Sequence, residues 1–243
     1  MTANLTLAHL YPDLMRTYGD RGNVMALASR ARWRGIDVDV VGVTRAERIP
    51  AGADLVLIGG GTDRAQETIG EDLRGRREEL RDLSGAGTVV VGICGGYQFL
   101  GHRYVDADGV AIEGLGLLDV TTVAGQPRII GNVRAAATFG GRSFELFGFE
   151  NHGGRTTLGS GATPLATVGR GQGNNGRDRT EGAVQGSIVG TYLHGPVLPT
   201  NPAFADALLA RALAAPGRPD AALAELDDRL EDEAHRLARA RKR

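Results

Sequence analysis

Short apolar runs alternate with longer amphipathic stretches along the first hundred positions of this chain. The runs have the length and the β-branched composition of buried strands. We expect strands at Leu5–Tyr11, Ile36–Val43, Ala53–Ile58 and Thr88–Ile93, and helices from Asp20, whose side chain can cap the first helix, to about Trp33, at Arg64–Leu83 and after Cys94. This order predicts an α/β fold, with an open, mostly parallel sheet flanked by helices. A site is then expected at the carboxyl ends of the strands.

The pattern changes after Gly109, where strand-like pieces are separated by glycine-rich turns. The pieces predict an antiparallel extension of the sheet, and they are Leu115–Val123, Arg128–Phe139 and Phe144–Glu150. The polar stretch Glu150–Arg155 has the composition of a turn. The segment Gly169–Gly182 contains no large apolar residue, so we expect a mobile loop there that could act as a lid.

The last part of the chain returns to strand and helix patterns. A strand at Ser187–Leu193 ends at His194, and Asn201 stands where it can cap a helix that runs to Leu213. The stretch Ala221–Arg243 has apolar residues at helical spacing, as in an amphipathic helix. Its acidic residues precede its basic residues, an order that the helix dipole favours. We therefore expect one α/β domain over residues 1–215 and a charged C-terminal helix over residues 216–243.

Composition narrows the possible functions of the 243-residue chain. A hydrophobic content of 42% supports a sizeable core, and a net charge of −1 gives no sign of a nucleic-acid partner. A single cysteine excludes an internal disulfide, which fits a cytoplasmic protein, and we expect neither a signal peptide nor a membrane segment. The only lysine is Lys242, so a Walker-type phosphate loop is excluded, and ATP would bind another chain.

The single cysteine lies at the most informative point of the sequence. Cys94 follows a buried strand, precedes a helix and is surrounded by Gly92, Gly95 and Gly96. Glycines around one reactive side chain are typical of a nucleophile elbow, in which a sharp turn projects the nucleophile beyond the sheet. The helix that follows would lower the pKa of the thiol and offer N–H groups to an oxyanion. A small buried cysteine without chemistry is the alternative interpretation.

A thiolate nucleophile also needs an oxyanion site and a base. The triplet Gly59–Gly61 follows a neighbouring strand and could offer a backbone N–H without an obstructing Cβ, although a glycine triplet alone is a weak signal. Among the five histidines, His152 and His194 remain as candidate bases, because His9, His102 and His235 lie in a strand, on the surface and in the tail helix. His194 is preferred because it stands at a strand end, where the elbow also opens.

These motifs resemble a known family. The segment Gly-Ile-Cys-Gly-Gly-Tyr-Gln-Phe-Leu-Gly at 92–101 resembles the nucleophile motif of class I glutamine amidotransferases. Four further segments are similar to the cobyric-acid-synthase-like branch, and most closely to stand-alone amidotransferase subunits of lipid II isoglutaminyl synthases: Leu10–Met15, Tyr18–Asn23, Phe149–Thr156 and Tyr192–Pro196. The resemblance covers about residues 5 to 213.

The resemblance implies a mechanism and a set of site residues. Cys94 would attack the side-chain amide of L-glutamine, and His194 would protonate the leaving ammonia. N–H groups near Gly60 and Gly95 would hold the oxyanion, and Gln98 would line the pocket. Arg128, whose sequence context alone suggests a solvated charge at a strand end, matches an arginine that this subfamily associates with glutamine binding. A guanidinium suits the α-carboxylate of the substrate.

The resemblance also implies a division of labour between two chains. Ammonia would pass to a Mur-ligase-like synthetase subunit in a heterodimer. That partner would bind ATP and Mg²⁺ and amidate the D-glutamate α-carboxyl of the lipid II stem peptide. This chain would hold no metal or cofactor of its own and would serve peptidoglycan synthesis from the cytoplasm.

One departure from the family pattern leaves the third catalytic group open. Many class I amidotransferases have a glutamate two residues after the histidine, where this chain has Pro196. A Cys–His dyad, an acid from elsewhere in the fold, or an acid from the partner would each complete the site, and we favour the partner. Alternative functions are amidation of cobyrinate-type corrinoids, a non-catalytic scaffold that binds a synthetase, and a cysteine peptidase on a related fold.

Overall fold

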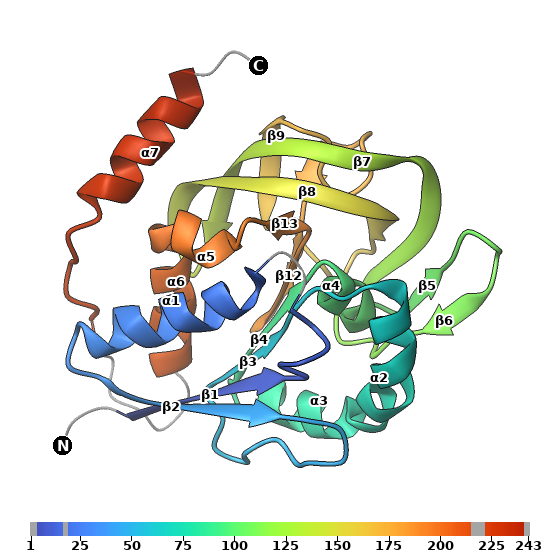
Figure 1. The fold of residues 1–243 in the computed structure, drawn as a ribbon, viewed down its shortest axis with the longest axis horizontal. Helices are drawn as coiled ribbons and strands as arrows, with labels where there is room; N and C mark the ends of the chain where they lie inside the picture. The colour runs from blue at the N-terminus through green and yellow to red at the C-terminus, as the bar shows by residue number, and fades with distance from the viewer. Residues whose placement is uncertain (1–3, 17–18, 215–221, 241–243) are drawn as a thin grey trace.

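The computed structural model of the chain describes residues 4–16, 19–214 and 222–240, and its elements form two sheets with helices around the first (Figure 1). The strands are β1 (Asn4–Leu10), β2 (Asp37–Val43), β3 (Leu55–Ile58), β4 (Val89–Ile93), β5 (Arg103–Val105), β6 (Ala111–Glu113), β7 (Val120–Phe139), β8 (Arg142–Leu158), β9 (Ala166–Arg170), β10 (Thr180–Glu181), β11 (Ala183–Gln185), β12 (Ile188–Thr191) and β13 (Leu193–His194). The helices are α1 (Arg21–Arg32), α2 (Asp63–Gly75), α3 (Arg77–Gly85), α4 (Gly95–Leu100), α5 (Val197–Thr200), α6 (Pro202–Leu213) and α7 (Arg229–Ala240).

The first sheet has six strands in the order β11-β12-β4-β3-β1-β2. Its pairs are parallel except for β11 with β12. Val90 belongs to one apolar core cluster, and its neighbours Val89 and Val91 belong to the other. Successive side chains of a strand point to opposite faces, so β4 is buried on both faces, as expected for a parallel sheet. Helices α1 and α6 cover one face, and α2 and α3 cover the other (Figure 1).

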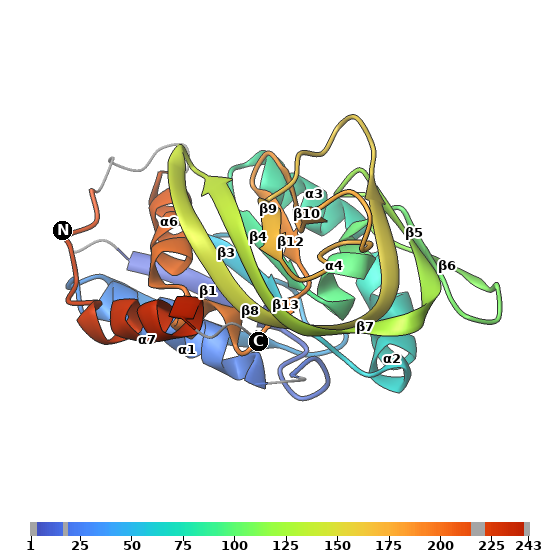
Figure 2. The ribbon, with the colours of Figure 1, turned by 90° about the horizontal axis from the view of Figure 1, so that it is seen from above.

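The second sheet is built on the long antiparallel pair β7 and β8, which runs across the top of Figure 1. Strands β9 and β5 pair with β7, and β13 pairs with β8. The strands predicted to extend the parallel sheet therefore form a separate sheet. Figure 2 shows β7 and β8 from above, where they pass in front of β4 and α4. After β12 the chain passes again from the first sheet to the second, between Thr191 of β12 and Leu193 of β13.

Several predicted elements differ in detail from the structure. The helix expected at Arg64–Leu83 is two helices that meet at Arg76, whose guanidinium bonds the backbone oxygens of Glu47 and Thr44. The predicted turn Glu150–Arg155 is wrong, because these residues lie inside β8. The loop before β10 is tied to the body of the protein through Asn174, whose side-chain oxygen accepts from the Tyr97 hydroxyl at 3.2 Å and whose backbone oxygen accepts from the Thr156 N–H at 2.9 Å.

The tail helix is shorter than predicted. Helix α7 begins at Arg229, and part of the predicted stretch, residues 215–221 and 241–243, lies outside the described residues. The segment before α7 is anchored because Arg30 of α1 forms ion pairs with Asp206 and Asp228, both at 2.7 Å. Within the described ranges, no helix combines the length and apolar character needed to cross a membrane.

Candidate active site

Cys94 forms the sharp turn between β4 and α4. Its backbone φ of 50° and ψ of −102° are rare for a residue with a side chain. The backbone N–H of Cys94 donates to the Thr191 oxygen at 2.8 Å, which ties the turn to β12. A Cβ on Gly96 would lie 2.3 Å from the Ile58 oxygen, so the turn requires a glycine there. This geometry is that of a nucleophile elbow, and Cys94 is partly exposed to solvent.

Gly60 marks the point where three loops meet. A Cβ built on Gly60 would lie 3.5 Å from Cβ of Cys94, 3.1 Å from Cε1 of His194 and 3.1 Å from Oδ2 of Asp20. The structure therefore brings Cys94 and His194 to one place, although 99 residues separate them in the sequence. Cys94 follows β4 of the first sheet, whereas His194 belongs to β13 of the second.

The N–H of Gly60 already has a partner in this structure. It donates to Oδ2 of Asp20 at 2.5 Å, and Oδ1 of Asp20 accepts from Asn23. The prediction that Asp20 caps α1 through its side chain is wrong, because the carboxyl group bonds the loop after β3 instead. Burial raises the pKa of Asp20 to about 7, although the hydrogen bonds from Gly60 and Asn23 oppose this shift.

The expected second oxyanion donor, Gly95, begins α4 beside the same loop. A Cβ on Gly95 would lie 2.9 Å from Nε2 of Gln66 and 3.4 Å from the backbone nitrogen of Gly61. Gln66 itself donates to the Gly61 oxygen at 3.2 Å. Helix α2 therefore supports the loop from one side, and Asp20 supports it from the other.

His194 is almost completely buried, with 1% of its surface exposed. Burial lowers its pKa to about 4, and the positive charge of Arg128 lowers it further. The imidazole is therefore neutral at neutral pH, as a general base must be before it takes a proton. Pro196, which stands where many class I amidotransferases have glutamate, packs against the first turn of α1: a Cβ on Gly22 would lie 2.5 Å from its ring.

Comparison with known proteins identifies the family to which this chain belongs. The CobB/CobQ-like glutamine amidotransferase domain matches residues 6–202. The chain belongs to this amidotransferase family.

Two curated relatives of the amidotransferase carry the same name, lipid II isoglutaminyl synthase (glutamine-hydrolyzing) subunit GatD. The protein from Staphylococcus aureus (strain N315) is 41% identical over 217 residues, which cover 88% of this chain and 87% of the relative. The protein from Streptococcus pneumoniae (strain ATCC BAA-255 / R6) is 38% identical over 211 residues, which cover 86% and 80%. A solved glutamine amidotransferase matches with a TM-score of 0.53 at 19% identity, covering 85% of this chain and 98% of that one. The fold is therefore that of the class I glutamine amidotransferases.

Arg128 of the amidotransferase lies at the exposed side of β7. Its Nε donates to Oδ1 of Asn151 at 2.6 Å, and its Nη2 donates to the Asn151 oxygen at 3.0 Å. The charge of Arg128 lowers the pKa values of His152 and His194, which places the guanidinium within electrostatic reach of the site.

Gln98 is buried one turn after Cys94. Its Nε2 donates to the hydroxyl of Tyr192 at 3.3 Å, and that hydroxyl also bonds Thr156 at 2.7 Å. A Cβ on Gly154 would lie 2.6 Å from Nε2 of Gln98. Gln98 thus links α4 to β8 and to the connection between the two sheets.

Sequence reasoning missed the role of Asp20, which it assigned to a helix cap. It weighed His152 as a candidate base but assigned it to a turn and preferred His194. The side chain of His152 is 1% exposed and stacks on Tyr192. Its position in a strand was obscured by Gly153 and Gly154, which interrupt the alternation of apolar and polar residues.

The remaining histidines lie in other environments. His9 is buried in β1, His102 is exposed and bonds Asp119, and His235 stacks on Phe147. Among the residues that the structure describes, no three His, Cys, Asp or Glu side chains lie close enough together to hold a metal ion.

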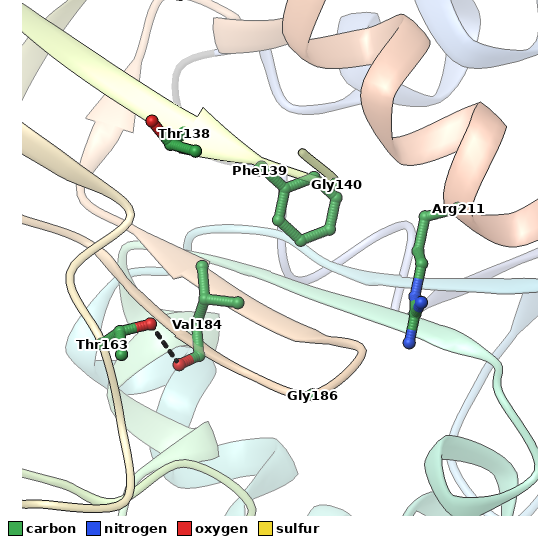
Figure 3. A pocket seen from close by; sticks show the side chains of 7 residues that line it. All are labelled: Thr138, Phe139, Gly140, Thr163, Val184, Gly186 and Arg211. Atoms are coloured by element: carbon green, nitrogen blue, oxygen red, sulfur yellow. Dashed lines mark hydrogen bonds between the residues drawn. The ribbon is translucent and has the colours of Figure 1, made fainter. Parts of the chain in front are cut away.

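A cavity of about 220 Å³ lies on another part of the molecule, between the end of β7, the β11–β12 turn and α6 (Figure 3). Its lining includes Gly186 and Arg211. Gly186 precedes β12, so this cavity is at the amino edge of the first sheet, whereas Cys94 follows β4 at the carboxyl edge. The cavity and the elbow are therefore separate features.

Proposed function

We propose that this chain is the glutamine-hydrolysing subunit of a lipid II isoglutaminyl synthase. The observation that carries the proposal is the meeting of Cys94, His194 and Gly60 at one point, in a chain that is similar to the two named relatives over most of its length. The chain would act in the cytoplasm and pass ammonia to a Mur-ligase-like synthetase subunit. The synthetase would bind ATP and Mg²⁺ and amidate the D-glutamate α-carboxyl of the lipid II stem peptide.

The first half of the reaction forms a thioester. His194 takes the proton of the Cys94 thiol, and the sulfur attacks the side-chain carbonyl carbon of L-glutamine. Backbone N–H groups near Gly60 and Gly95 hold the oxyanion. The protonated His194 gives its proton to the amide nitrogen, the C–N bond breaks and ammonia leaves. For Gly60 to act in this way its N–H must turn from Asp20 towards the substrate, so Asp20 sets the resting position of the loop.

The second half regenerates the enzyme. His194 takes a proton from water, and the resulting hydroxide attacks the thioester carbon. The C–S bond breaks, glutamate leaves, and the sulfur recovers the proton from His194.

Binding of the substrate at Arg128 changes the pKa of His194 in the direction that assists hydrolysis. Its positive charge is one cause of the lowered pKa of His194. When the α-carboxylate of glutamine pairs with Arg128, that repulsion is offset, and the pKa of His194 rises towards its ordinary range. Protonation of His194 during the reaction is then easier.

We further propose that the synthetase contributes a carboxylate to the site. Pro196 offers no acid, and both oxygens of Asp20 accept hydrogen bonds from Gly60 and Asn23. An added negative charge beside the buried imidazole would raise the pKa of His194 and stabilise the imidazolium. Glutamine hydrolysis would then be slow until the two subunits assemble.

The test compares glutamate formation from L-glutamine by the chain alone and with its synthetase subunit. We expect hydrolysis in the complex and a rate at least about tenfold lower without the partner. Equal rates would overturn the partner carboxylate. A complex that amidates a corrinoid and leaves lipid II unchanged would overturn the choice of acceptor. A chain without hydrolysis in either state would overturn the glutaminase assignment.

A further inference from the structure

His152 is a buried polar group that the mechanism above does not use. It lies on β8, opposite Ile129 of β7, within the Phe149–Thr156 segment. Its ring stacks on Tyr192 with centroids 3.7 Å apart and planes 7° apart, so its orientation is fixed. Only 1% of its surface is exposed.

The two ring nitrogens of His152 have different environments. Nδ1 lies 2.8 Å from the Gly154 oxygen, and because a carbonyl can only accept, Nδ1 carries a proton. Burial lowers the pKa of the ring to about 4, against the hydrogen bond to Gly154, so the ring is neutral. Nε2 is then a lone-pair acceptor, and within the described part of the chain it has no hydrogen-bond partner. A buried acceptor of this kind needs a donor.

The position of His152 indicates where that donor comes from. Tyr192, on which the ring stacks, precedes His194 by two residues and bonds Gln98 of the elbow helix. Two residues further along β8, a Cβ on Gly154 would lie 2.6 Å from Nε2 of Gln98 and 2.7 Å from the hydroxyl of Tyr192. His152 and Tyr192 therefore belong to the part of the second sheet that packs on the elbow helix.

The charges around His152 indicate what kind of donor it is. Arg155, Arg128 and His194 all lower the pKa of His152, so the surroundings disfavour a further positive charge. A neutral N–H donor fits these surroundings better than an ammonium group. The carboxamide of glutamine is a neutral group with two N–H donors.

We propose that Nε2 of His152 accepts a hydrogen bond from the carboxamide N–H of the substrate, which makes His152 a selectivity residue for amides. The inference rests on the proposed glutaminase function. A side-chain ester offers no N–H, and the ionised side chain of the product glutamate offers only acceptors, so both leave Nε2 without a donor. His152 would thus favour the substrate over the product at the same position.

The test measures kcat/KM of the complex with its synthetase for L-glutamine and for L-glutamate γ-methyl ester, which both acylate cysteine. His152→Asn keeps an N–H for the Gly154 oxygen and removes the acceptor at Nε2, whereas His152→Gln places an oxygen near Nε2. His102→Asn, at the exposed histidine, is the matched control. The amide-to-ester ratio cancels differences in the fraction of folded protein.

We expect the amide-to-ester ratio to fall about 5- to 50-fold in His152→Asn, to recover in His152→Gln and to stay unchanged in His102→Asn. Inhibition by glutamate should become stronger in His152→Asn. A ratio within about twofold of wild type in His152→Asn overturns the inference and leaves the glutaminase in place, because a purely structural role lowers both rates together. A wild-type complex that hydrolyses neither substrate overturns the proposed function, and this inference with it.

Discussion

The two sheets contribute different parts of the candidate site. The first sheet supplies the elbow of Cys94 and the loop of Gly60, both as backbone turns that follow parallel strands. The second sheet supplies side chains from strands, namely His152 of β8, His194 of β13 and Arg128 of β7. The first sheet therefore fixes the proposed nucleophile through backbone geometry, whereas the second places the proposed base and the groups proposed to recognise the substrate.

This difference indicates which parts of the candidate site tolerate amino-acid substitution without loss of the fold. A backbone turn is constrained by close approach, so a single methyl group can disrupt it. A side chain on a strand can be exchanged with the backbone intact, so its loss affects chemistry more than folding. The predictions below test this contrast.

Replacement of the proposed base, His194, should have the largest effect on activity. In His194→Asn we expect glutamine hydrolysis by the complex to fall about 10²- to 10⁴-fold, because no general acid or base remains beside the nucleophile. His102→Asn, at the exposed histidine that bonds Asp119, should retain wild-type rates. A fall of less than tenfold in His194→Asn would assign the proton transfers to another group.

A pair of glycine substitutions contrasts the two sheets directly. Gly96→Ala should lower the free energy of unfolding by more than about 2 kcal/mol, because its Cβ meets the Ile58 oxygen at 2.3 Å. Gly131→Ala on β7 should change it by less than about 1 kcal/mol, because the nearest atom, an oxygen of Glu150, is 3.8 Å away. Urea unfolding measures both changes in free energy. Similar values for the two variants would contradict the contrast between the two sheets.

Arg128→Gln tests recognition by the second sheet. We expect KM for glutamine to rise about 10- to 100-fold with a smaller change in kcat, because the partner of the α-carboxylate is lost. Since the charge of Arg128 lowers the pKa of His194, the acidic limb of the pH–rate profile should move to higher pH. Arg134→Gln, on the same strand, is the control. An unchanged KM would mean that Arg128 does not bind the substrate.

The smallest expected effect concerns stability and Glu181 of β10, which lies where the two sheets meet. Its Oε1 accepts from the Thr191 hydroxyl at 2.6 Å and from the Tyr192 N–H at 3.0 Å. Burial raises its pKa to about 7 from the ordinary value of 4.5, so the folded protein holds a proton that the unfolded chain releases. Stability from this group is present below pH 4.5 and is lost as pH rises towards about 7.

Glu181→Gln should remove that dependence. Between pH 5 and pH 7.5 the unfolding free energy of wild type should fall relative to the variant by about 1–3 kcal/mol. Urea titrations at the two pH values measure the difference. A difference that does not change with pH would mean that Glu181 ionises in the folded protein as it does in the unfolded chain.

Much of the first sheet was predictable from the sequence, because its strands are short apolar runs and its elbow is a local glycine pattern. The α/β class, the strands before α4 and the turn at Cys94 all follow from neighbouring residues. The second sheet was harder to predict, because β7 and β8 are long strands that pair across many residues and contain glycines. The roles of Asp20 and His152 depend on contacts with Gly60 and Tyr192, which are distant in sequence and leave no local signal.

The most direct test of the account is labelling of the complex with an electrophilic analogue of glutamine, followed by mass spectrometry of the chain. The account predicts one label per chain on Cys94, protection by L-glutamine and slower labelling in His194→Asn. An unlabelled Cys94 in a complex that hydrolyses glutamine would contradict the claim that this sulfur and this imidazole act on one substrate.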